Sequence, residues 1–284
     1  MNSNFVPIYV MEQIKPAAKK AVLWMLEAMV AWRLGKIKPA IVGVTGSVGK
    51  TSTKEAIYAV LGGHRTQKSY NTEFGVMLAV LEQESGYSSP LKWLVAMTRA
   101  FFSTLFLEPP YYRTLIVEMG ADKPRDIEYL VKHLPPQIGV LTAVKPVHLA
   151  EGQFKNVDEV LEEKSKLLAA LPRDGWAIVN ADDRRVIEVV PKLKCNVLSV
   201  GMSSKADLRA KEVESGLQGL KFTLSYEDRT HTLHFPHLLG EHQVYVILPA
   251  IAVGFLHGLS ITDIMEKLRD FKLPPGRMSV LEGV

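Results

Sequence analysis

The chain has 284 residues, of which 47% are apolar and 23% are charged, and its formal net charge is +4. This composition is that of an ordinary globular protein, which excludes a disordered chain, and the length suits one large domain or two. Basic and aromatic residues are not interleaved as they are on nucleic-acid-binding surfaces, so we expect no nucleic-acid partner. Cys195 is the only cysteine, which excludes disulfide frameworks and cysteine-rich metal sites and favours a reducing, cytoplasmic location.

The first predicted element is a helix over residues 21–34, AVLWMLEAMVAWRL, within an N-terminal helical segment, 1–38. The apolar run is too short for a membrane span and contains Glu27. Four apolar residues recur at helical spacing, which predicts packing on the protein's own core: Leu23, Leu26, Val30 and Leu34. Because lysines flank the run, peripheral contact with an anionic membrane is the alternative.

From residue 39 onward, short apolar runs alternate with helical patterns. Strands are predicted at 40–46, 114–120, 137–144, 176–182 and 196–201, and helices at 50–61, 74–83, 126–133, 158–170 and 241–257. Apolar, β-branched strands separated by helices indicate an α/β fold, with a mostly parallel sheet covered by helices on both faces. Between about 206 and 236 the apolar residues alternate every second position, which predicts a small antiparallel meander attached to this sheet.

A second apolar helix is predicted over about 91–106, in the segment SGYSSPLKWLVAMTRAFFSTLFLEPPYY. It lacks a polar face of normal width. We therefore expect this helix either to be buried or to form a docking surface.

The stretch VTGSVGKTST, residues 44–53, follows the first strand and opens a helix. This is the context of a phosphate-binding P-loop, in which backbone N–H groups, a lysine and a hydroxyl surround phosphate oxygens at a helix N-terminus. Gly46 and Gly49 would form the turn, Lys50 would bind the terminal phosphates, and Thr51 would bind Mg²⁺. The usual P-loop spacing has a glycine where this chain has Val44, and an ordinary glycine turn is the alternative.

Further polar residues follow the predicted strands, where open α/β sheets bind their ligands. Glu118 ends the strand TLIVE and could hold Mg²⁺, and His148 follows GVLTAVKPV and could hold a second ion. Lys164 lies sixteen residues after His148, near the predicted start of a helix.

Seven segments in order resemble the Mur ligase family, and within it the branch that adds D-alanyl-D-alanine. They are TGSVGKTS, YNTEFGVMLAVL (70–81), EMGADKP (118–124), HLAEGQF (148–154), EEKSKLLAALPRDGWAIVNADD (162–183), GEHQVY (240–245) and PPGRM (274–278). The resemblance covers roughly residues 40–278, and the ordered series is specific although each segment alone is weak. In this family the loop has the form TG-x-x-GK-T, which accounts for Val44.

The resemblance implies an ATP-dependent amide ligase of peptidoglycan-precursor synthesis that activates a carboxylate as an acyl phosphate. Its substrates would be ATP, a UDP-muramoyl-peptide-like donor and an amino acid or D-Ala-D-Ala. It implies nucleotide contacts from Thr45, Gly46, Ser47, Gly49, Lys50, Thr51, Ser52, Asn71, Thr72, Gln243 and Arg277. The implied ligands of two Mg²⁺ ions are Thr51, Glu118, His148 and a carbamylated Lys164, and Lys50, Glu118, His148 and Lys164 would be catalytic.

Two departures from the family pattern bear on function. The family's HN-x-x-N segment reads His242-Gln243-Val244-Tyr245-Val246, so Val246 cannot supply an amide, and Pro249 is expected to perturb that helix. The sequence also corresponds to a central ATP-binding domain at 39–272, followed by the start of a linker at 273–284. We therefore expect the UDP-binding and C-terminal domains to be absent, so that the chain is either a truncated product or one part of a split enzyme that a separate C-terminal polypeptide completes. The alternatives are a regulatory or scaffold module that binds ATP without ligase activity, and a folate-type polyglutamate ligase.

Overall fold

The computed structural model describes residues 16–67, 70, 72–84, 89–106 and 112–277. These residues form a sheet with strand order β2-β3-β1-β4-β5-β6-β7-β8-β9. The parallel strands are β1 (Ala40–Thr45), β2 (His64–Arg65), β3 (Thr114–Glu118), β4 (Ile138–Leu141), β5 (Trp176–Asn180) and β6 (Asn196–Gly201). β7 (Leu208–Gly216) starts parallel to β6 and then pairs antiparallel with β8 (Gly219–Tyr226), which pairs with β9 (Arg229–Phe235). The predicted parallel sheet and its antiparallel meander are both confirmed.

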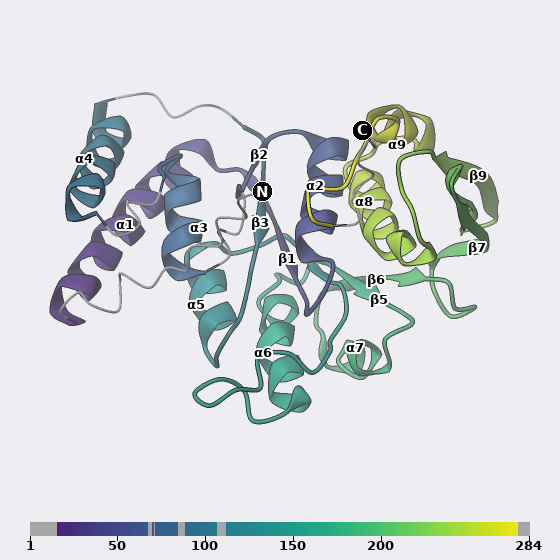
Figure 1. The fold of residues 1–284 in the computed structure, drawn as a ribbon, viewed down its shortest axis with the longest axis horizontal. Helices are drawn as coiled ribbons and strands as arrows, with labels where there is room; N and C mark the ends of the chain where they lie inside the picture. The colour runs from purple at the N-terminus through teal and green to yellow at the C-terminus, as the bar shows by residue number, and fades with distance from the viewer. Residues whose placement is uncertain (1–15, 68–69, 71, 85–88, 107–111, 278–284) are drawn as a thin grey trace.

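Helices cover the two faces of this sheet (Figure 1). On one face lie α2 (Lys50–Leu61), α8 (Val244–Leu256) and α9 (Ile261–Leu268), whose buried residues share a core with those of the meander. The other face carries α5 (Asp126–His133) and α6 (Val157–Ala169). The same core extends under α1 (Pro16–Ile37), α3 (Glu73–Val80) and α4 (Pro90–Phe106).

Each strand supplies both cores because successive side chains point to opposite faces. In β1, Ile41 belongs to the core under α5 and α6, whereas Val42 and Val44 belong to the core under α2 and α8. Burial on both faces explains why the central parallel strands read as nearly continuous apolar runs instead of alternating.

The predicted helices agree with the observed ones to within a few residues, with three notable differences. Asn156 begins α6 by accepting the N–H groups of Asp158 and Glu159, so Lys164 lies in the middle of the helix and not near its start. The predicted helix at 241–257 begins as a 3₁₀ turn (Glu241–Gln243), and Pro249 lies inside α8 without ending it. The sequence reading also missed β2, the short α7 (Arg184–Ile187), the 3₁₀ turn Val190–Lys192 and α9.

The N-terminal helix packs on the core, as its spacing predicts. Leu26, Met29, Val30 and Ile37 are buried, and α1 contacts α3, α4 and α5. Across the described ranges, no helix combines the length and apolar character that a membrane span requires.

The course of the chain creates a site at one edge of the sheet. After β1 the chain passes to β2 and β3 on one side, and it then returns to form β4 on the other side of β1. The carboxyl ends of β3, β1 and β4 are therefore neighbours at a reversal of strand order, which is where open α/β sheets bind ligands.

Candidate functional site

The segment between β1 and α2 is a short glycine loop. Val44 lies inside β1, where it pairs with Glu118 of β3 and Val140 of β4, so the turn begins only after Thr45. Gly46 has φ 148°, and a Cβ at this position would lie 2.0 Å from Oγ1 of Thr142. Gly49 has φ 81° and precedes the first residue of α2. Val44 is thus a strand residue, and both glycines are required by the backbone.

Hydrogen bonds from neighbouring strands hold this loop in place. The Ser47 N–H donates to the Ala143 carbonyl (2.6 Å), and Oγ of Ser47 both accepts from the Lys145 N–H and donates to the Lys145 carbonyl. Oγ1 of Thr142 donates to the Val48 carbonyl at 2.6 Å. The side chain of Thr45 is buried and donates to the Met119 carbonyl (2.7 Å). The loop is therefore preformed, and the Thr45 and Ser47 side chains support it.

Lys50 and the first turn of α2 face the interior of the loop. Nζ of Lys50 donates to the Gly46 carbonyl (2.8 Å) and the Ser47 carbonyl (3.4 Å). Burial lowers the pKa of Lys50, with nearby Arg277 adding to the decrease and Glu118 opposing it. Since the first N–H groups of a helix lack intrahelical acceptors, loop, helix end and lysine together make a cradle for an anion. Ser52 is buried in the first turn of this helix.

Thr51 and Glu118 supply adjacent oxygen atoms at the mouth of the loop. Oγ1 of Thr51 donates to Oε1 of Glu118 (3.1 Å). Oε2 of Glu118 is buried without a hydrogen bond, and its nearest cation is Nζ of the fully buried Lys54, 3.7 Å away. A buried carboxylate oxygen with spare acceptor capacity, beside a hydroxyl, fits Mg²⁺, which binds through one or two carboxylates together with phosphate oxygens.

The C-terminal part of the described chain returns to the same loop, as the yellow trace in Figure 1 shows. Nη2 of Arg277 lies 3.4 Å from Oγ1 of Thr51, although the two residues are 226 positions apart. A guanidinium at this position adds a second cation to the phosphate cradle.

His148 and Lys164 lie on the α5–α6 side of the site. Nδ1 of His148 is 3.5 Å from Oδ1 of Asp122, and His148 has φ 57°. Lys164 is 1% exposed, and burial followed by the charge of Lys50 lowers its pKa to about 8. The carboxylates of Asp122, Glu163 and Asp126 oppose this decrease only in part.

The predicted metal ligands are not all in mutual contact. Thr51 and Glu118 are hydrogen-bonded, whereas His148 is paired with Asp122. In the part of the chain that the structure describes, no three His, Cys, Asp or Glu side chains gather closely enough to hold a metal ion. The geometry therefore fits one Mg²⁺ at Thr51 and Glu118 and does not preform a second site at His148 and Lys164.

The remaining predicted nucleotide contacts lie on other elements. Gln243 is buried, its Nε2 is 2.8 Å from Nε2 of His242, and its Oε1 has no hydrogen-bond partner. Val246 belongs to the apolar core under α8, so the missing amide at this position is replaced by packing. Thr72 immediately precedes α3, and Asn71 lies outside the described residues.

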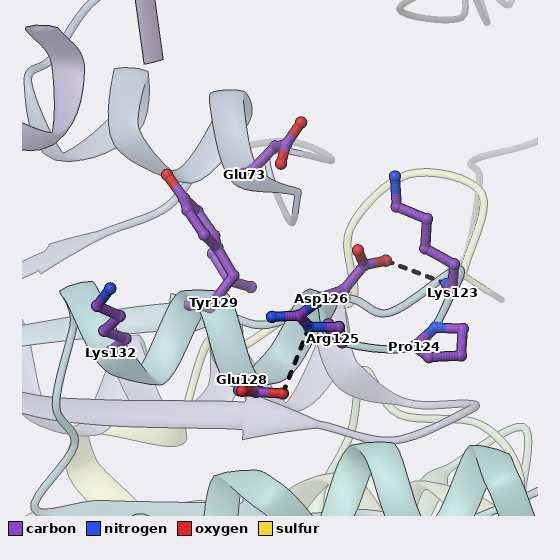
Figure 2. A pocket seen from close by; sticks show the side chains of 10 residues that line it. Glu73, Lys123, Pro124, Arg125, Asp126, Glu128, Tyr129 and Lys132 are labelled. Carbon is purple, nitrogen blue, oxygen red and sulfur yellow. Dashed lines mark hydrogen bonds and ion pairs between the residues drawn. The ribbon is translucent and has the colours of Figure 1, made fainter. Parts of the chain in front are cut away.

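A pocket of about 330 Å³ opens beside this site (Figure 2). It is lined by the loop after β3, by the first turns of α5 and by Glu73 of α3. Lys123, Arg125 and Lys132 contribute cations to its wall, and Oδ2 of Asp126 accepts the Lys123 N–H at 3.1 Å.

The family described as the Mur ligase middle domain matches residues 44–254, well over half of the sequence. The chain belongs to the Mur ligase family. Its sequence is 26% identical over 261 residues to the UDP-N-acetylmuramoyl-tripeptide–D-alanyl-D-alanine ligase of Haemophilus influenzae, covering 89% of this chain and 50% of that protein. It is 31% identical over 257 residues to the ligase of the same name from Mycobacterium bovis, covering 89% and 45%.

Solved structures of Mur ligases share this fold. The MurF ligase of Thermotoga maritima in complex with ADP superposes with a TM-score of 0.72 at 24% identity, covering 92% of this chain and 55% of that one. The chain thus spans about half the length of the Mur ligases it matches.

Three supporting residues escaped the sequence reading. Lys54 donates from Nζ to the Thr66 carbonyl (2.7 Å) beside Glu118, Asp122 pairs with His148, and Thr142 supports the loop. Lys54 follows Lys50 by four residues in α2, and this spacing places both lysines on the same face of the helix. The sequence therefore contained a local indication that Lys54 lies near the site. The contacts of Asp122 and Thr142 depend on strand order and carry no local signal.

Proposed function

We propose that this chain carries the ATP-binding and carboxylate-activating centre of a Mur-type amide ligase of peptidoglycan-precursor synthesis. The observation that carries the proposal is the Lys50 loop, with Thr51 and Glu118 hydrogen-bonded at its mouth. The relatives named as UDP-N-acetylmuramoyl-tripeptide–D-alanyl-D-alanine ligases support this reaction class. The chain spans about half the length of those proteins. We also propose that a polypeptide carrying a C-terminal ligase domain takes part in the reaction, and that the reaction takes place in the cytoplasm.

ATP would bind with its phosphates in the loop of residues 45–52. Lys50 and Arg277 would neutralise the terminal phosphates, and Thr51 and Glu118 would hold Mg²⁺, which supplies further charge neutralisation when bound. Gln243 has a free buried acceptor for the adenine end of the nucleotide. Thr72 and Asn71 would contact the nucleotide and the donor substrate near its phosphate.

The reaction proceeds in two transfers. An oxygen of the donor carboxylate attacks the γ-phosphorus of ATP, the bond from that phosphorus to the β,γ-bridging oxygen breaks, and ADP leaves with the electron pair. The amine of the second substrate then attacks the acyl carbon, the acyl–phosphate C–O bond breaks, and phosphate leaves while the nitrogen loses a proton. The contribution of the chain is positioning and charge neutralisation, because a carboxylate and a triphosphate repel each other.

Lys164 is proposed to be carbamylated. A neutral amine is needed for its nitrogen to attack CO₂, form the N–C bond and release a proton, and burial favours the neutral form by lowering the pKa to about 8. The product is a carboxylate-like group that, with His148, would hold a second Mg²⁺.

The pocket beside α5 is proposed to take the UDP-muramoyl-peptide-like donor. Its wall carries three cations, Lys123, Arg125 and Lys132, which would bind the anionic groups of such a donor. It also carries three carboxylates, Glu73, Asp126 and Glu128, which would accept hydrogen bonds from the donor's hydroxyl and amide groups. The second substrate, an amino acid or D-Ala-D-Ala, would arrive with the separate polypeptide.

The proposal is tested by phosphate release from ATP in a reconstituted mixture. The chain and a polypeptide carrying the C-terminal ligase domain are combined with UDP-muramoyl-tripeptide, D-Ala-D-Ala and Mg²⁺. We expect ADP and phosphate release that requires both acyl substrates and is lost in Glu118→Gln but kept in Leu217→Ser, whose side chain is 94% exposed on the meander. Nucleotide binding without such release would indicate the regulatory or scaffold module instead, and turnover with a folate and glutamate would indicate a folate-type ligase.

A further inference from the structure

The outward faces of α1 and α4 are apolar. On α4, six large side chains are at least 42% exposed, namely Leu91, Leu94, Val95, Phe101, Phe102 and Leu105, and Phe106 at its end is 69% exposed. These positions follow the i, i+3, i+4 spacing of one helix face. The opposite face packs mainly through Trp93 and the small residues Ala96 and Ala100. Apart from Trp93, the helix therefore buries mainly small residues and exposes most of its large ones.

The outward face of α1 has the same character. Trp24, Met25 and Trp32 are 68%, 41% and 38% exposed, and the exposed positions between them are alanines. α1 and α4 contact each other at the end of the molecule opposite the meander (Figure 1). Both apolar faces thus belong to one end of the protein, and we call them together the α1–α4 surface.

The exposed charged side chains on these two helices are all basic. Lys20 and Lys36 lie exposed at the two ends of the outward face of α1, and Lys92 and Arg99 are exposed on α4. Nζ of Lys36 lies 3.6 Å from the centre of the Trp32 ring. The single acidic residue of the two helices, Glu27, is turned inward, where it accepts a hydrogen bond from Oη of Tyr129 (2.6 Å).

We propose that the α1–α4 surface docks the protein on an anionic lipid bilayer, with α4 lying in the plane of the interface. Helices that bind bilayer surfaces combine Trp, Phe and Leu on the inserted face with flanking Lys and Arg, which is the composition found here. A second copy of the chain fits less well. A symmetric contact would bring the four cations of one copy to the same interface as the four of the other, with no carboxylate on the outward faces of α1 and α4 to pair with them. The charge of the surface complements that of phosphatidylglycerol headgroups.

The test is flotation of the full chain with vesicles of phosphatidylcholine alone and of phosphatidylcholine with phosphatidylglycerol. We expect capture by the anionic vesicles that weakens at high salt, since the screening length falls from about 10 Å at 0.1 M salt to about 3 Å at 1 M. Phe101→Ser/Phe102→Ser should reduce binding by about tenfold or more, because each exposed ring loses its transfer into the apolar layer. Both side chains are exposed, so the double variant should melt at the temperature of the parent.

Two further variants separate the possible outcomes. Leu217→Ser removes a more exposed apolar side chain from the meander and should leave capture unchanged, whereas Lys20→Glu/Lys36→Glu should weaken it. Emission from Trp24 and Trp32 should shift to shorter wavelength on binding. Equal capture of the parent and of the phenylalanine double variant would overturn the proposal. A dimer in sedimentation velocity that this variant loses, together with no vesicle capture, would overturn it in favour of an interface between copies. Failure of the ligase proposal would leave vesicle binding unaffected.

Discussion

Replacing Lys164 by Met is predicted to change how the stability of the protein depends on pH. The lysine is 1% exposed in the middle of α6, and its pKa is lowered from 10.5 to about 8 by burial and by Lys50. Between these two pKa values the unfolded chain binds more protons at this site than the folded protein does. The stability of the parent therefore rises with pH between these two values. Below about pH 8, where Lys164 is charged in both states, its burial destabilises the folded protein to the full extent.

The size of the effect follows from the same two values. A difference of 2.5 between 10.5 and about 8 corresponds to roughly 3 kcal/mol of destabilisation near neutral pH. From about pH 7 to about pH 9.5 the free energy of unfolding of the parent should rise by roughly 2 kcal/mol relative to that of Lys164→Met. The rise is smaller than the full value of about 3 kcal/mol because the interval between about pH 9.5 and the unfolded pKa of 10.5 is not covered. The contributions of other titrating groups to the pH dependence are the same in both proteins and cancel in the difference, unless those groups contact Lys164.

Urea unfolding of both proteins in bicarbonate-free buffer measures this difference. Lys166→Met is the matched control on the same helix. The hydrogen bond to Glu163 raises the pKa of Lys166, so its contribution is fully present below the unfolded value and constant over this range. A stability difference between parent and Lys164→Met that stays constant from pH 7 to 9.5 would refute the reasoning.

Three other predictions concern the site. With ¹³C-labelled bicarbonate, the parent should give a carbamate signal in carbon NMR that Lys164→Arg lacks, since arginine stays charged; a signal in both would place the carbamate elsewhere. Gly46→Ala should weaken MgATP binding at least about tenfold, because the new Cβ would lie 2.0 Å from Oγ1 of Thr142 and the φ of 148° disfavours alanine. Gly216→Ala is the control and should bind MgATP normally, since a Cβ at that position would have no atom within 4 Å. Glu118→Gln should raise the Mg²⁺ concentration needed for nucleotide binding by about tenfold or more, and an unchanged requirement would exclude this carboxylate as a ligand.

The sheet and the loop could be predicted because their causes are local. A strand buried on both faces is apolar along most of its length, and β1, β3, β4 and β5 read that way, with polar residues only at their ends. The loop requires two glycines and a lysine within a few residues, so its sequence is distinctive. The helix α9 was missed although Ser260 and Asp263 form a capping box at its start, a signal that is local and readable.

The rest of the site depends on contacts that the sequence does not encode locally. Whether Glu118 faces Thr51, and whether Asp122 faces His148, follows from the placement of β1 between β3 and β4. The outward direction of the large residues on α4 was also open, because both faces of that helix are apolar and only packing decides which is buried. From the sequence, Val246 indicates the loss of an amide that would bind the nucleotide. In the structure its side chain is part of the apolar core.

Calorimetric titration of the chain with ATP in the presence of Mg²⁺ tests the central claim most directly. Binding should require Mg²⁺ and should be lost in Lys50→Met, which removes the cation that donates into the loop. Lys92→Met, at an exposed lysine on α4 far from the loop in sequence, should bind as the parent does. The account predicts one nucleotide per chain with these dependences, and it would be contradicted by the absence of binding or by equal binding in Lys50→Met.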